Sequence, residues 1–467
     1  MNDGIKIFLD AVGIFFIIYL IGYSTFLFLS VLSGSLELYK NYRQEKLKSI
    51  LPFDYTVPVT VIVPAYNEEI TVTDTVKSLL DLEYRAYEII VVDDGSEDGT
   101  SDSLINEFSM KKVNRPIRRR IACRMETAVY ESRAQKVPLT LIKKQNGGKA
   151  DALNMGINAS NFPYFICIDA DSILQYDSLR KVTEPILKDD SVVAVGGSVN
   201  ISNDIKMENA RVKKYKMPRS LLASMQVLEY DRSFLAARIL FDKFNGSLII
   251  SGAFGLFKKD MVIAAGGYDN KTVGEDMELV VKLHDYCTVN NIDYRIKYAN
   301  DAVCWTQVPE KLGDLCRQRR RWHIGLFQSM TGHKAMLMNS KFGAVSFISY
   351  MYFLVYELLS PFIEVFGVLT ILVAWATDLV NIRFMVLFFL IYAGFGVILS
   401  LTAFFSRAYT DELRISAPDA LKAVFLCLFE LTCLRFILAW VRATALFGSK
   451  SKKMKWGSIK RKKMNIK

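Results

Sequence analysis

A long stretch without any charged side chain near the N-terminus constrains the fold of this chain more than any other feature. Residues 11–36, AVGIFFIIYLIGYSTFLFLSVLSGSL, are long enough to cross a lipid bilayer as a helix. A signal peptide would have a shorter apolar core after a more basic start, whereas here the positive residues follow, in KNYRQEKLK. The positive-inside rule therefore predicts that the N-terminus lies outside and that the chain from Lys40 onward lies in the cytosol.

Three further apolar stretches, residues 343–376, 384–406 and 420–447, follow later in the chain. Because a cytosolic domain and a cytosolic tail require an even number of crossings between them, the three cannot all be simple spans. Either one splits into two passes or one lies in the membrane interface. Ionisable residues inside them are expected to face a polar cavity, the alternative being side chains that reach the interface from helix ends. These residues are Glu357, Glu364, Glu430, Arg435 and Arg442.

The composition agrees with a membrane protein and limits its partners. Hydrophobic residues make up 51% of the chain and the mean hydropathy is +0.19, which is high for a soluble protein. The net charge is +11, and residues 450–467 contribute nine positive charges and no negative one. We interpret residues 448–467 as a basic cytosolic tail near anionic lipid headgroups. No nucleic-acid recognition motif accompanies this tail, so nucleic acid is not an expected partner.

The seven cysteines form no close Cys-x-x-Cys pair. An odd number with scattered spacing favours free thiols in a reducing compartment over a disulfide framework or a zinc site.

The middle of the chain, residues 57–310, shows the alternation of strand and helix patterns that is typical of an α/β domain. Apolar, β-branched runs occur at residues 57–66, 87–94, 138–144, 163–171 and 191–197. Helical periodicity occurs between several of these runs, as in residues 68–82 and 150–160. This alternation predicts a parallel sheet that is covered on both faces. Residues 110–137 interrupt the pattern as a charged insertion, to which the sequence assigns no role.

Acidic residues end two of the predicted strands, where ligands bind in sheets of this kind. Asp169 and Asp171 are two positions apart, and two carboxylates with this spacing can share a Mg²⁺ or Mn²⁺ ion that holds a diphosphate; the alternative is a solvated turn. Asp93 and Asp94 stand where a carboxylate can accept hydrogen bonds from a ribose or a base; the alternative is a cap for the following helix.

Two helix N-termini carry the other candidate groups. Lys149 follows Gly147 and Gly148 at a predicted helix start, where an ammonium group and free amides suit a phosphate. The glycine spacing is not that of a P-loop, which disfavours ATP hydrolysis. Glu275 and Asp276 lie in the first turn of an amphipathic helix, where the helix dipole favours acids for structural reasons. The functional alternative is that Asp276 acts as a general base toward an attacking hydroxyl.

The sequence RQRRRWHIG places Gln318, Arg321 and Trp322 on one face of a helix, because they are three and four residues apart. A basic flank for a membrane helix is the simpler interpretation, with Leu315, Trp322 and Leu326 as a surface anchor. However, an indole ring stacks on a sugar, and glutamine and arginine donate to hydroxyl or phosphate oxygens. An anchor alone would not need Gln318, so we expect a binding surface.

These motifs, in this order, resemble those of the processive family 2 glycosyltransferases, which include the cellulose, hyaluronan and poly-N-acetylglucosamine synthases. The resemblance covers nearly the whole chain, although Gly274 stands where that family commonly has threonine. The motifs are VPAYNEE (63–69), DDGS (93–96), Lys149, DAD (169–171), SGAFGLF (251–257), GED (274–276) and the Q-x-x-R-W pattern at 318–322.

The resemblance implies an α/β domain of the GT-A type, with a Rossmann-like mixed sheet, inserted between N-terminal and C-terminal transmembrane helices. The implied boundaries are residues 1–40 for the first membrane helix, 55–310 for the cytosolic domain, 311–341 for interfacial helices, 342–447 for the membrane channel and 448–467 for the tail. The implied site residues are Tyr66, Asp93, Asp94, Lys149 and Asp169 for the UDP-sugar, Asp169 and Asp171 for Mg²⁺ or Mn²⁺, Asp276 with Glu275 for catalysis, and Gln318, Arg321 and Trp322 for the donor and acceptor.

The implied activity is inverting transfer of glucose or N-acetylglucosamine from a UDP-sugar to a growing β-linked polysaccharide, which passes across the plasma membrane. Implied partners are the donor, the polymer, membrane lipids and accessory secretion subunits. Two alternatives stay open: a non-processive enzyme that adds one sugar to a lipid carrier, and a silent channel or scaffold subunit. A catalytically silent subunit would not need the acidic residues of the site, yet Asp93, Asp94, Asp169, Asp171 and Asp276 are all present in this chain.

Overall fold

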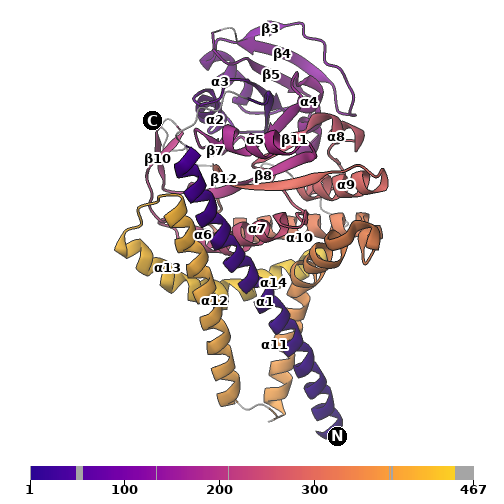
Figure 1. The fold of residues 1–467 in the computed structure, drawn as a ribbon, viewed down its shortest axis with the longest axis vertical. Helices are drawn as coiled ribbons and strands as arrows, with labels where there is room; N and C mark the ends of the chain where they lie inside the picture. The colour runs from indigo at the N-terminus through magenta and orange to yellow at the C-terminus, as the bar shows by residue number, and fades with distance from the viewer. Residues whose placement is uncertain are drawn as a thin grey trace.

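The computed structural model describes residues 2–48, 56–132, 134–208, 210–377, 379 and 382–447. A globular domain built on a ten-stranded sheet lies at one end, and long helices project from it at the other (Figure 1). The N-terminal helix α1 (Asn2–Lys48) packs against α12 and α11, two helices from the C-terminal part of the chain. The basic tail predicted at residues 448–467 lies outside the described residues.

The sheet has the strand order β3-β4-β5-β2-β1-β6-β11-β8-β12-β7. Its strands are β1 (Val59–Ala65), β2 (Tyr87–Asp93), β3 (Lys111–Val113), β4 (Glu126–Ser132), β5 (Leu139–Lys144), β6 (Tyr164–Cys167), β7 (Ser172–Leu174), β8 (Val192–Ile201), β11 (Gly255–Lys258) and β12 (Arg295–Thr306). A separate hairpin consists of β9 (Lys206–Glu208) and β10 (Arg211–Lys214).

Both faces of the sheet are covered, as the continuous apolar strands predict. All seven residues of β1 are buried, and they alternate between two hydrophobic clusters, with Val61 and Val63 in one and Ile62 in the other. The helices of this domain are α2 (Val72–Leu80), α3 (Thr100–Glu107), α4 (Lys149–Ala159), α5 (Ser178–Lys188), α8 (Lys259–Ala264) and α9 (Glu275–Val289).

The five apolar runs all contain strands, namely β1, β2, β5, β6 and β8, but the sheet is parallel only in part. Strands β5, β2, β1 and β6 are parallel to one another. The prediction of a wholly parallel sheet is wrong beyond β6, because β11 lies between β6 and β8 and pairs with both of them antiparallel. The mixed sheet of the GT-A type is confirmed. The charged insertion, residues 110–137, forms β3 and β4, which extend the sheet antiparallel from β5.

A layer of helices connects the globular domain to the projecting ones. It contains α6 (Leu221–Glu229), a π-helical segment η1 (Tyr230–Ala236), α7 (Ala237–Asp242) and α10 (Leu312–Gly332). Beyond it follow two π-helical segments, η4 (Val345–Tyr350) and η5 (Phe353–Leu358), and the helices α11 (Ser360–Ala376), α12 (Ile382–Thr410), α13 (Ala417–Phe429) and α14 (Arg435–Ala443).

Within the described residues, three helical segments are long and apolar enough to cross a membrane: Lys6–Gln44, Met385–Thr410 and Ala417–Leu446. A fourth candidate is the pair Val345–Leu358 and Ser360–Ala376, bent by 45° at the break between them. Figure 1 shows α1, α11 and α12 pointing away from the sheet, whereas α13 and α14 run across the base of the domain. This arrangement favours the interfacial alternative for residues 420–447, which leaves an even number of crossings after the globular domain.

Candidate active site

One cavity of about 580 Å³ connects the globular domain with the projecting helices. Its lining includes Lys149, Asp169, Asp171, Glu275 and Asp276 from the globular domain, Gln318, Arg321 and Trp322 from α10, and Tyr23 from α1, Glu364 from α11 and Arg435 from α14. A larger cleft of about 1850 Å³ lies between the end of α1 and the β9–β10 hairpin, and its lining contains none of the predicted site residues. The first cavity is therefore the candidate active site.

Lys149 lies at the centre of the charged end of this cavity. Its ammonium nitrogen is 2.5 Å from Asp169 Oδ1 and 3.6 Å from Glu275 Oε1. Burial works to lower the pKa of Lys149, but these two carboxylates outweigh it and raise the pKa, so the side chain is charged at neutral pH. Burial raises the pKa of Glu275, and Lys149 opposes that shift. The cluster offers one fixed positive charge to an incoming anion.

Asp276 lies in the first turn of α9 and faces the same cavity. Its Oδ2 accepts a hydrogen bond from the backbone amide of Gly252 at 3.1 Å, and its Oδ1 accepts one from the amide of Met277 at 2.9 Å. A Cβ atom on Gly252 would lie 3.2 Å from Lys149 Nζ and 3.4 Å from Asp276 Cβ. The glycine in SGAFGLF therefore allows the lysine and the acid to approach one backbone segment.

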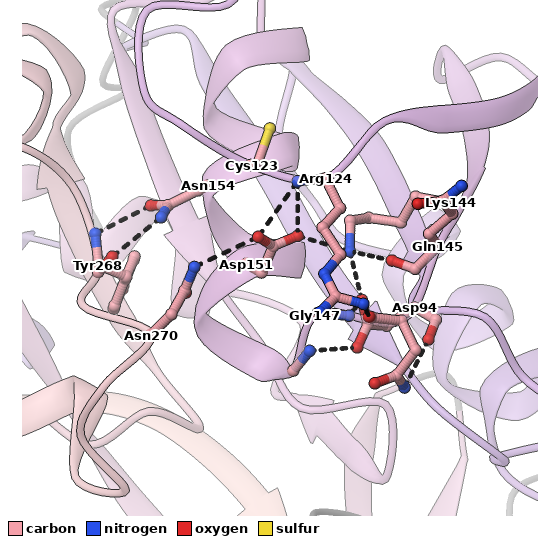
Figure 2. Close-up of polar contacts among 12 residues, drawn as sticks. Asp94, Cys123, Arg124, Lys144, Gln145, Gly147, Asp151, Asn154, Tyr268 and Asn270 are labelled. Atoms are coloured by element: carbon pink, nitrogen blue, oxygen red, sulfur yellow. Dashed lines mark hydrogen bonds and ion pairs between the residues drawn. The ribbon is translucent and has the colours of Figure 1, made fainter.

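A buried charge cluster underlies the loop that precedes Lys149 (Figure 2). Lys144 is fully buried and its ammonium contacts the carboxylates of Asp94 and Asp151, the latter at 2.6 Å. Asp94 also accepts hydrogen bonds from the amides of Gly147 and Gly148, at 3.0 and 2.7 Å. These bonds fix the Gly-Gly turn from which Lys149 starts α4. The guanidinium of Arg124, from the charged insertion, donates a hydrogen bond to the carbonyl oxygen of Asn146 in the same loop.

The structure does not bring every predicted site residue to the cavity. Its lining, among the described residues, does not include Tyr66, Asp93 or Asp94. Both aspartates are buried, and Asp93 accepts hydrogen bonds from the amide of Ser96 and the hydroxyl of Ser101. Because their carboxylates already bind donors of the chain itself, direct contact of Asp93 and Asp94 with a nucleotide stays a prediction.

The helix α10 carries the Q-x-x-R-W pattern along the side of the cavity. Gln318, Arg321 and Trp322 all line it, as the i, i+3, i+4 spacing predicts. The Oε1 atom of Gln318 is enclosed and has no hydrogen-bond partner within the part of the chain that the structure describes. Gln328 Oε1, ten residues further along α10, accepts hydrogen bonds from Thr272 Oγ1 and the amide of Val273, both at 3.0 Å. This contact ties α10 to the loop before Asp276.

The ionisable residues of the C-terminal apolar stretches face a polar cavity, which confirms that prediction. Arg435 Nη2 lies 2.7 Å from Glu364 Oε1, and Arg442 Nη2 lies 3.3 Å from Glu357 Oε2. The fifth residue, Glu430, pairs with Arg232 of η1 at 2.6 Å. All of these side chains line the candidate active-site cavity.

The cavity offers two carboxylates to a metal ion, those of Asp169 and Asp171. No group of three or more His, Cys, Asp or Glu residues among those described is arranged to hold a metal by itself. Mg²⁺ keeps most of its ligands as water and substrate phosphate and needs only one or two carboxylates, so this pair fits such an ion when a diphosphate is present.

Several residues that shape the site were not expected from their sequence patterns. Lys144 ends an apolar strand, and a lysine in that position is a signal that could have been noticed. Glu229, Arg319 and Gln328 act through contacts between distant parts of the chain, and the sequence gives no local signal for them.

Comparisons with known proteins agree with the fold and the motifs. Residues 60–123 match the family described as "Glycosyl transferase family 2", and residues 123–325 match "Glycosyltransferase like family 2". The chain is 31% identical over 280 residues to the poly-beta-1,6-N-acetyl-D-glucosamine synthase of Staphylococcus aureus (strain COL) and 33% identical to that of Staphylococcus epidermidis. Each alignment covers 60% of this chain and 55% of the relative, so the chain spans about half the length of these relatives.

Among solved structures, the chain is similar to a mannosyltransferase, PcManGT, from Pyrobaculum calidifontis, in complex with GDP-Man and Mn²⁺. The TM-score is 0.51 at 19% identity, and the alignment covers 88% of this chain and 99% of the other. At this identity the likeness supports the fold.

Proposed function

We propose that this chain, which belongs to glycosyltransferase family 2 through residues 60–325, polymerises a β-linked polysaccharide from a UDP-hexose and passes it across a membrane. The curated relatives name N-acetylglucosamine as the sugar of their product, which makes UDP-N-acetylglucosamine the first donor to test and UDP-glucose the second. The globular domain faces the cytosol of a plasma-membrane enzyme, with lipids around the apolar helices and accessory secretion subunits as further partners.

One observation carries this proposal. The same cavity is lined by Lys149 and Asp276 at one end, by Trp322 in α10, and by Glu364 of α11 and Arg435 of α14 at the other. A nucleotide-sugar enzyme that released a soluble product would need only the first part. A route lined by aromatic rings and charged pairs, which leads from the acids into apolar helices, suits a polar chain that leaves through the membrane.

The proposed reaction is a single displacement at C1 of an α-linked sugar. The acceptor hydroxyl attacks C1, Asp276 takes its proton, and the bond from C1 to the diphosphate oxygen breaks as UDP leaves. Lys149 holds positive charge where negative charge develops on the diphosphate. Asp169 and Asp171 would hold a divalent cation, which would supply further charge neutralisation at the leaving group. Displacement from the face opposite the leaving group gives the β-linkage.

The acceptor end of the polymer is assigned to α10. The enclosed Oε1 of Gln318 is an acceptor without a partner among the described residues, and the Trp322 indole lies in the cavity wall. A sugar hydroxyl can donate to the first, and a sugar face can stack on the second. Arg321 lies on the same helix face and supplies a cation for the phosphates.

The experiment is to incubate the purified, detergent-solubilised chain with radiolabelled UDP-N-acetylglucosamine, UDP-glucose or GDP-mannose and Mg²⁺. We expect UDP release and a high-molecular-weight product from one UDP-sugar, which a linkage-specific β-glycosidase digests. A short, organic-soluble product would instead identify the lipid-carrier alternative. Absence of nucleotide release from all three donors would contradict enzymatic function and favour the scaffold alternative.

A further inference from the structure

Arg319 is the most buried of the four arginines in the segment RQRRRW. Its side chain is 6% exposed, whereas Arg317 and Arg320 point to the surface. A buried guanidinium is costly unless it is paired and hydrogen-bonded, so its contacts indicate what its burial achieves.

The contacts of Arg319 join two helices at the indole of Trp322. Its Nη2 donates to Glu229 Oε2 of α6 at 2.7 Å, across a sequence separation of 90 residues. The same guanidinium lies over the Trp322 ring, 4.4 Å from the ring centroid. Phe234 of η1 contacts Trp322 edge-to-face, with ring centroids 6.1 Å apart. Glu229, Arg319, Phe234 and Trp322 all line the cavity that contains Asp276.

We propose that Glu229 and Arg319 are positioning residues that hold the Trp322 indole at the wall of the cavity, where it retains the terminal sugar of the growing chain between transfers. The inference rests on the proposed function and adds to it residues that the Q-x-x-R-W pattern does not contain. Only arginine suits this position, because its planar guanidinium stacks on an aromatic ring while its edge donates to a carboxylate. A lysine ammonium can pair with Glu229 but cannot provide the flat stacking surface.

Retention of the polymer and binding of the donor are separate properties here. The diphosphate end of the cavity is built around Lys149, which contacts Asp169 and Glu275. Arg319 contacts Glu229 and Trp322 instead. Loosening the indole should therefore release the polymer earlier without changing how the donor binds, which a purely structural role for the buried pair would not do.

The test compares Arg319→Lys, Glu229→Gln and the double variant with Arg320→Lys, a matched change one residue away on the exposed side of α10. Mean chain length and the KM for the UDP-sugar are measured together. We expect each single change to shorten the product about tenfold and to leave the KM within about twofold. The double variant should be about as impaired as the single ones, because both contacts act through the position of the same indole. Arg320→Lys should give wild-type lengths.

The outcomes separate this inference from the function on which it rests. Two outcomes would overturn the inference and leave the proposed function intact. One is that Arg319→Lys and Arg320→Lys give products of equal length. The other is that Arg319→Lys shortens the product and raises the KM for the UDP-sugar to the same extent. Absence of polymer from the wild-type chain would remove the proposed function and the inference with it. Should Arg319→Lys elute as an aggregate, Glu229→Gln decides by the same readout, because it keeps the guanidinium on the Trp322 ring and its amide oxygen can still accept a hydrogen bond from Arg319.

Discussion

Gly274 and Gly325 bring two helices into direct backbone contact. A Cβ atom on Gly274 would lie 2.8 Å from the Cα of Gly325, and one on Gly325 would lie 2.7 Å from the Cα of Gly274. Gly274 immediately precedes helix α9 and lies two residues before Asp276, and Gly325 follows Trp322 by less than one turn of α10. The contact therefore sets the separation between the proposed base and the proposed acceptor surface, and it gives a physical reason for glycine at position 274.

The first prediction is that Gly325→Ala abolishes polymer synthesis while UDP still binds. The added methyl group meets backbone atoms, which cannot move aside as a side chain can, so α10 must shift away from α9 at a cost of about 1–3 kcal/mol. Even a small displacement of the acceptor from the base lowers the rate strongly, by about 100-fold per ångström. Polymer yield and UDP affinity of the purified variant measure the two effects.

Gly313→Ala is the matched control, because Gly313 lies in the same helix and a Cβ atom there would meet no atom within 4 Å. It should keep full activity. If Gly325→Ala also kept full activity, the close contact would have no part in spacing the two helices.

The second prediction concerns Asp276. Replacing it with Asn keeps the size and, through its single amide oxygen, one of the two hydrogen bonds from Gly252 and Met277, but removes the proton acceptor. We expect synthesis to fall at least about 100-fold, with UDP affinity in a calorimetric titration unchanged. Asp260→Asn, on the exposed surface of α8, is the control for a generic loss of charge. Retained synthesis by the Asp276 variant would remove this residue from the role of base.

The third prediction is dependence on a divalent cation. Asp169 and Asp171 offer two carboxylates, and Mg²⁺ completes such a site with substrate phosphate and water, so chelation should abolish transfer reversibly. Mg²⁺ or Mn²⁺ should restore it, and Asp171→Asn should raise the metal concentration for half-maximal activity at least about tenfold. Full activity in excess EDTA would contradict the assignment of Asp169 and Asp171.

Those parts of the fold that are encoded in a short run of residues could be predicted from the sequence, and those that depend on contacts between distant residues could not. The strands β1, β2, β5 and β6 were predictable because each is a mostly apolar run of strand length. The four residues of β11, in contrast, lie within the motif SGAFGLF and have no pattern that shows where they pair. Their insertion between β6 and β8 reverses the strand direction, and this depends on contacts far apart in the chain.

The candidate site divides in the same way. The short-range patterns placed Lys149, Asp169, Asp276 and Trp322, which the structure brings to one cavity. The same patterns also predicted a nucleotide contact for Asp94, whose carboxylate binds Lys144 and two backbone amides in the structure. A sequence shows that an acid ends a strand, but it does not show whether a cation from another strand already pairs with it.

The fourth prediction follows from that buried pair. Lys144→Met leaves the carboxylates of Asp94 and Asp151 buried without their cation, which should destabilise the chain by about 3–5 kcal/mol and loosen the turn before Lys149. The donor KM should rise as well, because Lys149 starts from that turn. Lys143→Met, the neighbouring half-buried lysine on the other side of β5, is the control and should behave like the wild type in thermal unfolding.

Adding Asp94→Asn to Lys144→Met tests the cause. Removing the uncompensated charge should recover part of the lost stability if charge burial is responsible. If Asp94→Asn instead lowers the free energy of unfolding further when it is added to Lys144→Met, the unpaired charge of Asp94 is not what destabilises the Lys144→Met variant.

The fifth prediction concerns pH and the helix that carries Asp276. His284 of α9 is fully buried, with Nδ1 2.7 Å from the hydroxyl of Tyr294 and Nε2 2.9 Å from the carbonyl oxygen of Ser247. Burial lowers the pKa of His284 from its usual 6.5 to about 4, against a smaller opposing effect of the Ser247 carbonyl. The folded chain therefore keeps this imidazole neutral at a pH where the unfolded chain protonates it.

Below pH 6.5 the unfolded state binds a proton at His284 that the folded state does not bind, so the free energy of unfolding falls as the pH is lowered from 6.5 toward 4. The total loss is at most about 3 kcal/mol. Thermal unfolding between pH 7.5 and 5 measures this loss. His284→Gln cannot titrate, so its melting temperature should fall less steeply over that range, even though its stability at pH 7.5 is lower. Parallel curves for the two proteins would show that protonation of His284 does not contribute to acid unfolding of this domain.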